Sequence, residues 1–275
     1  MKNYGLDIDK IVIRKEDWRF GANLPLKKIS ADGQYDTSLP EYEAQADKYE
    51  TWGCTVWGLQ NHVELALKFL FNIDANYIER YNYNLSEVSA PGCDPNIVYE
   101  DARKHGFLDV GLSPLPDTYE EFCTPRPMTE SFKKRGELWK TKYEFYHEWI
   151  IPLKPEKMKE AIVSSLFYSP GVTLSVTAWS KDSDGLYIDG GLQNNHWCLC
   201  YGYRNTPEGI VLKIFDTYDH SKKEIHPNHT VSFAKRIHIE KIEPKLSFWA
   251  RIYKLFMEQK LIYRAFKIFN IENNL

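Results

Sequence analysis

The longest helical pattern in the sequence begins at Cys54. Apolar residues recur after it at intervals of three and four positions, which predicts an amphipathic helix with one buried face. The positions of this stripe are Val56, Leu59, Val63, Ala66, Leu67 and Leu70. A second helix is predicted between Asp94, whose carboxylate can cap the first turn, and Gly106, a residue type at which helices often end.

The pattern changes in the second half of the chain. Pro155 suits a first helical turn, and the helix that it starts is predicted to end before the turn at 169–171. Beyond that turn the apolar residues either alternate with polar ones or run together, as they do in strands with one or both faces buried. The predicted strands are 172–179, 196–203, 209–215 and 231–242.

Helices therefore come first and strands follow, which indicates an α+β protein built from two packed halves. We expect an extended N-terminal segment at 1–44, with a short strand at 10–14, and then a helical subdomain at 45–152. The last part of that subdomain, 117–150, is predicted to be a helical insertion with loops. A β-rich subdomain at 153–245 and a C-terminal amphipathic helix at 246–275 complete the chain.

The composition of the 275 residues is that of a soluble globular protein, with 43% hydrophobic and 27% charged residues. A net charge of −3 gives no sign of the basic face that nucleic-acid-binding proteins usually carry, so no nucleic-acid partner is expected. No signal peptide is visible, and no apolar run approaches the ~20 residues that span a bilayer. The five cysteines, an odd number, fit free thiols in a reducing compartment, and the predicted location is the cytoplasm.

Cys54 is a candidate nucleophile because it lies where a helix is predicted to begin. The positive end of a helix dipole lowers the pKa of a thiol and favours the thiolate, which is the nucleophilic form. Gly53 allows either a tight turn or the close approach of a substrate. The alternative is that Cys54 is a small buried residue of the core, and this segment by itself leaves both interpretations open.

His196 has the position expected of the base that such a thiol needs. It opens a predicted strand directly after the polar stretch 190–195, so that the strand can hold its ring rigidly. Asp216 ends the next strand, and hairpin-connected strands bring the end of one beside the start of the other. The carboxylate can then accept a hydrogen bond from the imidazole and fix its tautomer. Taken singly, a core histidine and a turn aspartate are simpler explanations.

Acyl transfer also needs hydrogen-bond donors for the oxyanion that develops on the substrate. The backbone N–H of Cys54 at the start of its helix is one candidate donor. The side-chain amide of Gln45 is a second, although a surface glutamine is the simpler interpretation. Trp52 and Gly53 flank Cys54 and are predicted to contact the substrate.

Together these residues resemble the site of the papain-like cysteine peptidases. The matching residues, in chain order, are Gln45, Cys54, His196 and Asp216. The more specific similarity is the strand at 169–178, the tyrosine-containing loop at 184–190, and Gly202-Tyr203 after the histidine. The resemblance spans roughly residues 40–240 and is closest to divergent bacterial and phage members. Gln45 lies further before Cys54 than is usual in that family, and Asp216 stands where asparagine is commoner.

The resemblance implies a papain-like α+β fold, with a helical half, an antiparallel sheet or barrel, and an active-site cleft between them. It also implies cleavage of peptide or amide bonds in a peptide or protein substrate through a Cys54–His196–Asp216 triad, with no cofactor and no metal. Deamidation and acyl transfer use the same constellation and remain alternatives within this class.

Two further hypotheses compete with catalysis. The chain can be an inactive papain-like module used for binding or for assembly, for example in a virion, because a fold does not guarantee a function. The basic amphipathic helix at 246–275 would then contact a protein partner or a membrane surface, unless it simply docks on its own domain. A zinc site is the other hypothesis, because His196, Cys198 and Cys200 share one strand face near Cys54, but their ~7 Å spacing is too wide for one tetrahedral ion.

Overall fold

The computed structural model describes residues 5–17, 19–20, 35–40, 44–112, 116–123, 130–219 and 221–242. The chain divides into two compact units, 1–241 and 242–275. The helix predicted at 246–275 lies outside the described residues. Within the described part, none of the helices combines the length and the apolar character needed to cross a membrane.

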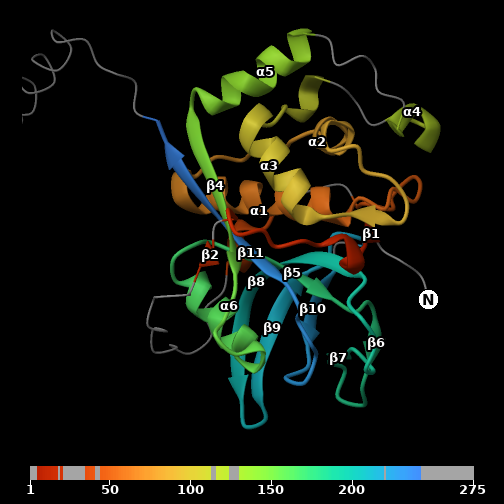
Figure 1. The fold of residues 1–275 in the computed structure, drawn as a ribbon, viewed down its shortest axis with the longest axis vertical. Coiled ribbons are helices and arrows are strands. Elements are labelled where there is room, and N and C mark those ends of the chain that lie inside the picture. The colour runs from red at the N-terminus through yellow and green to blue at the C-terminus, as the bar shows by residue number, and fades with distance from the viewer. Residues whose placement is uncertain are drawn as a thin grey trace, which may run out of the picture. The chain divides into compact units, whose positions relative to one another are not determined.

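The helices of the first unit precede most of its strands, as the sequence predicts (Figure 1). The first helix begins at Cys54, and its residues 54–67 are all buried, so it forms the centre of the helical part. The third helix is capped by Asp94, whose carboxylate accepts the backbone N–H of Asn96 at 2.8 Å. The helices are α1 (Cys54–Phe71), α2 (Glu79–Leu85), α3 (Pro95–His105), α4 (Tyr119–Cys123), α5 (Glu130–Lys140) and α6 (Met158–Leu166).

The strands of the described part form one nine-stranded sheet and one two-stranded sheet. The large sheet has the order β2-β4-β11-β5-β8-β9-β10-β7-β6 and is antiparallel except where β2 meets β4 and β10 meets β7. The small sheet pairs β1 with β3 in parallel. The strands are β1 (Gly5–Leu6), β2 (Arg19–Phe20), β3 (Gly92–Cys93), β4 (Tyr143–Ile150), β5 (Val172–Val176), β6 (Ser180–Lys181), β7 (Tyr187–Ile188), β8 (His196–Thr206), β9 (Gly209–Phe215), β10 (Lys222–Ile225) and β11 (Ala234–Lys241).

Two segments differ from the sequence prediction. Residues 10–14 form no strand, although the side chains of Ile11 and Ile13 pack against a buried cluster. The insertion at 117–150 contains the helices α4 and α5, but its last residues form β4, which pairs with β11. Buried residues alternate there with less buried ones, and this period of two is that of a half-buried strand; the buried set is Tyr143, Phe145, His147 and Trp149, and the less buried set is Glu144, Tyr146 and Glu148.

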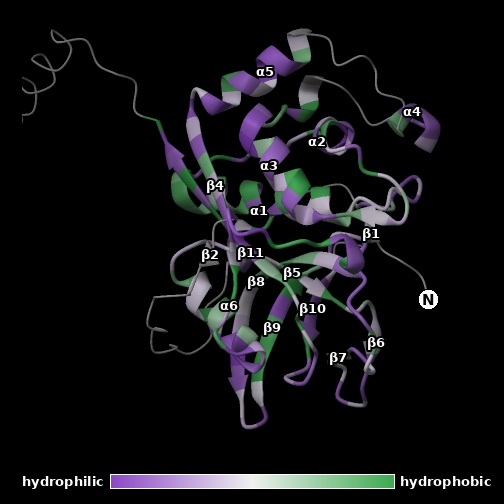
Figure 2. Ribbon diagram, in the orientation of Figure 1, coloured by the Kyte–Doolittle hydropathy of each residue, from purple (hydrophilic) through white to green (hydrophobic). Residues whose placement is uncertain are grey.

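Two apolar clusters make up most of the core. One joins α1 and α3 to the aromatic residues of α5 and β4, and the other joins α6 to the inner residues of β5, β8 and β9. Figure 2 shows the outer helix α5 as mainly hydrophilic, in keeping with its position over the first cluster. The two clusters hold α1 and β8 rigidly, and these are the elements that carry Cys54 and His196.

His62 on α1 makes the stability of this core sensitive to acid. Its side chain is fully buried beside Gly171, and burial lowers its pKa to about 3. Because the folded-state pKa lies below the unfolded value, the stabilising contribution is complete above pH 6.5 and is lost as the pH falls towards 3. When the pH is lowered from 8 to 5, the free energy of unfolding should decrease in both proteins. We expect this decrease to be about 2 kcal/mol smaller in His62→Gln than in the wild type.

Urea unfolding of both proteins at the two pH values measures this difference. His147 and His229, whose pKa values burial lowers to about 4, are present in both proteins and cancel in the comparison. Equal losses of stability in the two proteins would show that His62 is not the source of the acid sensitivity.

Candidate active site

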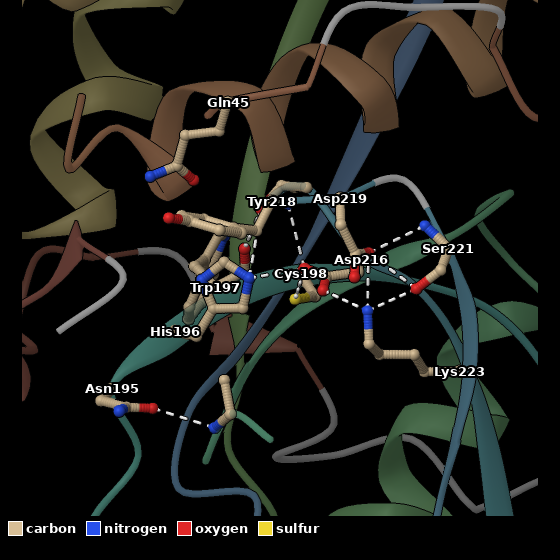
Figure 3. A network of polar contacts seen from close by, with 12 residues as sticks. Gln45, Asn195, His196, Trp197, Cys198, Asp216, Tyr218, Asp219, Ser221 and Lys223 are labelled. Carbon is tan, nitrogen blue, oxygen red and sulfur yellow. Dashed lines mark hydrogen bonds and ion pairs between the residues drawn. The ribbon is translucent and has the colours of Figure 1, made fainter. Parts of the chain in front are cut away.

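His196 and Asp216 form a buried hydrogen-bonded pair at the end of the β8–β9 hairpin (Figure 3). His196 is the first residue of β8, and Asp216 directly follows β9, which runs antiparallel to it. The Nε2 atom of His196 lies 2.6 Å from Oδ1 of Asp216, and both side chains are 0% exposed. The backbone N–H of Tyr218 donates to the same oxygen at 3.0 Å. The structure thus places these two residues side by side, as the hairpin argument from the sequence predicts.

Asp216 has a second charged partner, which the sequence-based prediction does not include. The Nζ atom of Lys223 on β10 lies 2.5 Å from Oδ2 of Asp216. Burial opposes ionisation of the carboxyl group, but His196 and Lys223 outweigh it and hold the pKa of Asp216 well below its usual range. The sequence of β10 contains a pattern from which the burial of this lysine could have been predicted. Side chains alternate between the two faces of a strand, so Lys223 lies on the same buried face as Ile225.

Cys54 lies next to the start of β8. It is the first residue of α1, with Gly53 at the N-cap position. The backbone N–H of Trp197 lies near the Cys54 thiol and favours its thiolate, and the two residues share one apolar cluster. Since Trp197 directly follows His196, the thiol lies beside the peptide segment that carries the imidazole.

The state of this thiol differs from the sequence prediction. The start of a helix should lower the pKa of a cysteine, but burial raises the pKa of Cys54 well above its ordinary value, and the nearby charge of Asp216 adds to this rise. The N–H of Trp197 acts in the opposite direction and is outweighed. Cys54 is 0% exposed, so the low-dielectric surroundings penalise the thiolate more than the helix start favours it.

The N-terminal strand β1 provides part of this burial. Leu6 is 1% exposed and packs in one cluster with Cys54, Trp149 and Trp197. Its neighbour Gly5 pairs with β3, and a Cβ atom at Gly5 would lie 2.2 Å from the carbonyl oxygen of Trp52. With a φ of +106°, this position requires glycine twice over, for its backbone conformation and for its close contact.

Asp17 fastens the other end of the same N-terminal segment. One of its oxygens accepts the indole N–H of Trp149 at 3.2 Å, and the other accepts the side-chain amide of Asn96 at 3.3 Å. Residues 5–17 are therefore tied to the body of the unit at both ends, with Leu6 in the buried cluster that contains Cys54. We call this stretch the N-terminal cover.

The amino-acid sequence matches no protein-family model, and none of the curated proteins is significantly similar to it. Solved structures are similar nevertheless. Xylellain, a cysteine protease from Xylella fastidiosa, superposes with a TM-score of 0.64 at 11% identity, over 88% of this chain and 97% of that one. Procathepsin L 3 from the larval midgut of Tenebrio molitor gives a TM-score of 0.59 at 12% identity, over 86% and 76% of the two chains.

The fold is papain-like. The proform of the ragweed pollen cysteine protease Amb a 11 also matches, with a TM-score of 0.55 at 14% identity, over 81% of this chain and 69% of that one. The mixed α+β architecture predicted from the sequence, helices followed by a mostly antiparallel sheet, is confirmed by these matches and by the strand order.

The remaining candidate residues, Gln45, Trp52 and Gly53, have partners within the protein. Gln45 is 2% exposed, and its side-chain amide donates to Glu50 at 3.4 Å. Its backbone N–H donates to the carbonyl of Thr217, the residue after Asp216, at 3.0 Å. Trp52 has a left-handed φ of +51°, and its half-buried ring contacts Tyr119 edge-on.

Gly53 is required by packing in the folded protein. A Cβ atom there would lie 2.6 Å from the ring of Trp57 on the next turn of α1, so no larger residue fits without displacing that ring. The roles of Gln45, Trp52 and Gly53 in binding a substrate stay predictions.

A group of potential metal ligands lies within the same site. In the described part of the chain, His196, Cys198 and Asp216 offer ligand atoms within 4.8 Å of one another. Cys200 is not a member of this group, and its thiol donates to the carbonyl of Gly202 at 3.3 Å. The oxygens of Asp216 already contact His196 and the ammonium of Lys223, and that positive charge opposes the binding of a cation. We therefore interpret the group as the surroundings of the His196–Asp216 pair.

Proposed function

We propose that the protein is a thiol hydrolase that cleaves peptide or amide bonds, with Cys54 as nucleophile, His196 as base and Asp216 as the residue that orients the base. The observation that carries the proposal is the 2.6 Å contact between Nε2 of His196 and Asp216, with Cys54 packed in one cluster with Trp197, the residue after His196. In this proposal Nε2 of His196 keeps its contact with the carboxylate, and the other ring nitrogen is assigned to proton exchange with the Cys54 thiol.

The proposed reaction is built on these positions. The imidazole takes the proton of Cys54, and the thiolate attacks the carbonyl carbon of the substrate. The oxyanion that forms is stabilised by the backbone N–H of Cys54 at the first position of α1. Its collapse expels the amine, which takes the proton from His196, and water then hydrolyses the thioester. Gln45 is the proposed second donor to the oxyanion, and in that role its amide would release Glu50.

The experiment that tests this function is hydrolysis of a pool of fluorogenic peptide amides, together with alkylation of the thiols by iodoacetamide and peptide mass spectrometry. Because β1 buries Cys54, both assays use the wild type and a Leu6→Ala variant, each also with Cys54→Ala. Hydrolysis that disappears with Cys54→Ala in either background supports the proposal. An uncovered Cys54 that neither cleaves peptides nor reacts faster than Cys123 rules it out.

A second candidate function is supported by the burial of the thiol. Cys54 and His196 are both 0% exposed, as they would be in an inactive papain-like module used for binding or assembly. The two candidates differ in the behaviour of the thiol once β1 is displaced. An enzyme gains access to its thiolate, whereas an inactive scaffold exposes an ordinary cysteine that ionises only near pH 8.5.

We further propose a reducing location such as the cytoplasm, or a virion assembled there, since all five cysteines are free thiols. The proposed substrate is a peptide or protein, because the papain-like neighbours xylellain and procathepsin L 3 are cysteine proteases or their precursors by name.

Asp216 and His196 are expected to differ in their effect on hydrolysis. His196→Ala removes the proton acceptor, and we expect kcat/KM to fall by about 10³-fold or more. Asp216→Ala removes only the orienting group, so its loss of kcat/KM should be about tenfold to a hundredfold smaller than that of His196→Ala. Steady-state kinetics of both variants measure the order, and a larger loss in Asp216→Ala would show that the roles are assigned wrongly.

A further inference from the structure

Lys223 is a buried cation at the far side of the His196–Asp216 pair. It lies on β10 opposite Ile214 of β9, and it is only 4% exposed. Its ammonium group contacts Oδ2 of Asp216 at 2.5 Å, Oδ1 of Asp219 at 2.6 Å and the hydroxyl of Ser221. Figure 3 shows it reaching Asp216 from the side opposite His196.

The two oxygens of Asp216 have separate partners. Oδ1 accepts the imidazole of His196 at 2.6 Å and the backbone N–H of Tyr218 at 3.0 Å, with the Cys198 thiol at 3.5 Å. Oδ2 faces Lys223. The ring of Trp179 lies 5.1 Å from the ammonium and 5.9 Å from the His196 ring, so it packs against both ends of this arrangement. One carboxylate therefore connects an imidazole to an ammonium group in a buried site.

This arrangement has an electrostatic consequence for the thiol. A buried carboxylate close to Cys54 opposes formation of the thiolate, and Asp216 does so here. An ammonium group on the other oxygen cancels that charge while the hydrogen bond to His196 is kept. The other titratable groups that face the site are Cys54 on α1, Cys198 on β8, Tyr187 on β7, and Glu50, Tyr218 and Asp219 in the adjoining loops.

We propose that Lys223 is a positioning residue of the site, whose ammonium group makes Asp216 act as an electrically neutral acceptor towards His196. The inference rests on the proposed function, since it concerns how the Cys54–His196 pair becomes reactive. The Asp216–Lys223 pair then orients the imidazole as a neutral side-chain amide would, without placing net negative charge beside the thiolate.

The test is a double-mutant cycle on Asp216 and Lys223 in which the pH of thiolate formation is measured. The readout is the ultraviolet absorbance of the Cys54 thiolate, taken as the difference from the same variant carrying Cys54→Ala, which needs no access to the thiol. In Lys223→Met the uncompensated carboxylate should raise the pH midpoint by about one unit. In Asp216→Asn the carboxylate charge near the thiol is gone, while Lys223 keeps Asp219 as its ion-pair partner, so the midpoint should fall. In the double variant Asp216→Asn, Lys223→Met the two shifts should cancel and the midpoint should return towards that of the wild type.

Two control variants separate this role from a structural one. Lys159→Met removes a half-buried lysine whose ammonium donates to the backbone carbonyls of His226 and Pro227, and it should leave the midpoint in place. Asp219→Asn removes the half-exposed partner of Lys223 and should shift it little. Circular dichroism confirms that each variant is folded.

The outcomes distinguish this inference from the proposed function. Opposite shifts that cancel in the double variant support the role of Lys223, and they do so whether or not any peptide is cleaved. An unchanged midpoint in folded Lys223→Met overturns it, even if the wild type proves to be an active hydrolase. A double variant that stays as displaced as Lys223→Met overturns it as well, because the two charges would then not act on each other.

Discussion

Replacing Cys54 with alanine is expected to abolish the proposed thiol-dependent hydrolysis, with kcat/KM at least about 10³-fold lower, and to leave the protein folded. The proposed reaction passes through a bond between the sulfur and the substrate, and alanine offers no nucleophile. The fold is expected to survive because Cys54 is the first residue of α1, where alanine suits the helix, and because one buried sulfur atom contributes only about 1 kcal/mol to stability.

Peptide hydrolysis and thermal unfolding of the variant, beside those of Cys200→Ala, measure this result. Cys200 is the matched control, because it is equally buried but its thiol bonds to the carbonyl of Gly202, away from the His196–Asp216 pair. Full activity in Cys54→Ala would remove the nucleophile from the proposal, and equal losses in both variants would show that packing, not chemistry, had been disturbed.

Truncating Leu6 to alanine is expected to expose the thiol. Large-to-small substitutions of buried leucines cost about 2–5 kcal/mol, and Leu6 is the residue of the N-terminal cover that belongs to the buried cluster of Cys54, beside the partly buried Ile11 and Ile13. The lost energy should therefore appear as local opening of the cover, not as unfolding of the whole unit. Alkylation of Cys54 should become about 30-fold faster or more.

Peptide mass spectrometry after timed alkylation follows this change at each cysteine. Val12→Ala is the control, because Val12 lies in the same segment but is 54% exposed, and it should leave the rate at Cys54 unchanged. If Leu6→Ala accelerates alkylation at all five cysteines alike, the unit opens globally and the cover is not a separate element.

Much of the architecture can be predicted from the sequence because local signals and tertiary packing agree there. The apolar stripe after Cys54, the Asp94 cap and the alternation in the second half each specify an element that the structure contains. Residues 143–150 are the instructive exception. Their lysine-, tyrosine- and tryptophan-rich context suggests a helical insertion. Their alternation of buried and less buried residues instead specifies a strand, and this strand pairs with β11, nearly a hundred residues later in the chain.

The site is predictable only in part, for a related reason. His196 and Asp216 belong to one hairpin, so their proximity follows from short-range pairing. The burial of Cys54 by the N-terminal cover depends on the packing of Leu6 with Trp149 and Trp197, which lie far along the chain. No local sequence pattern indicates this packing. The pKa of the Cys54 thiol is the clearest example. Its position at the start of a helix predicts a lowered pKa, but burial by residues distant in the sequence raises it.

The position of Leu6 also orders events during synthesis of the chain. Leu6 packs with Trp149 and Trp197, so its docking place is incomplete until the polypeptide has grown past residue 197. At about 5–20 residues per second, this leaves β1 without its pocket for roughly 10–40 s after it is made. The helical half has all of α1 and α3 by then, so β1 is made before these helices but is among the last elements to settle. A nascent chain stalled before β8 should therefore carry Cys54 exposed, and the thiol becomes sheltered only as the sheet is completed.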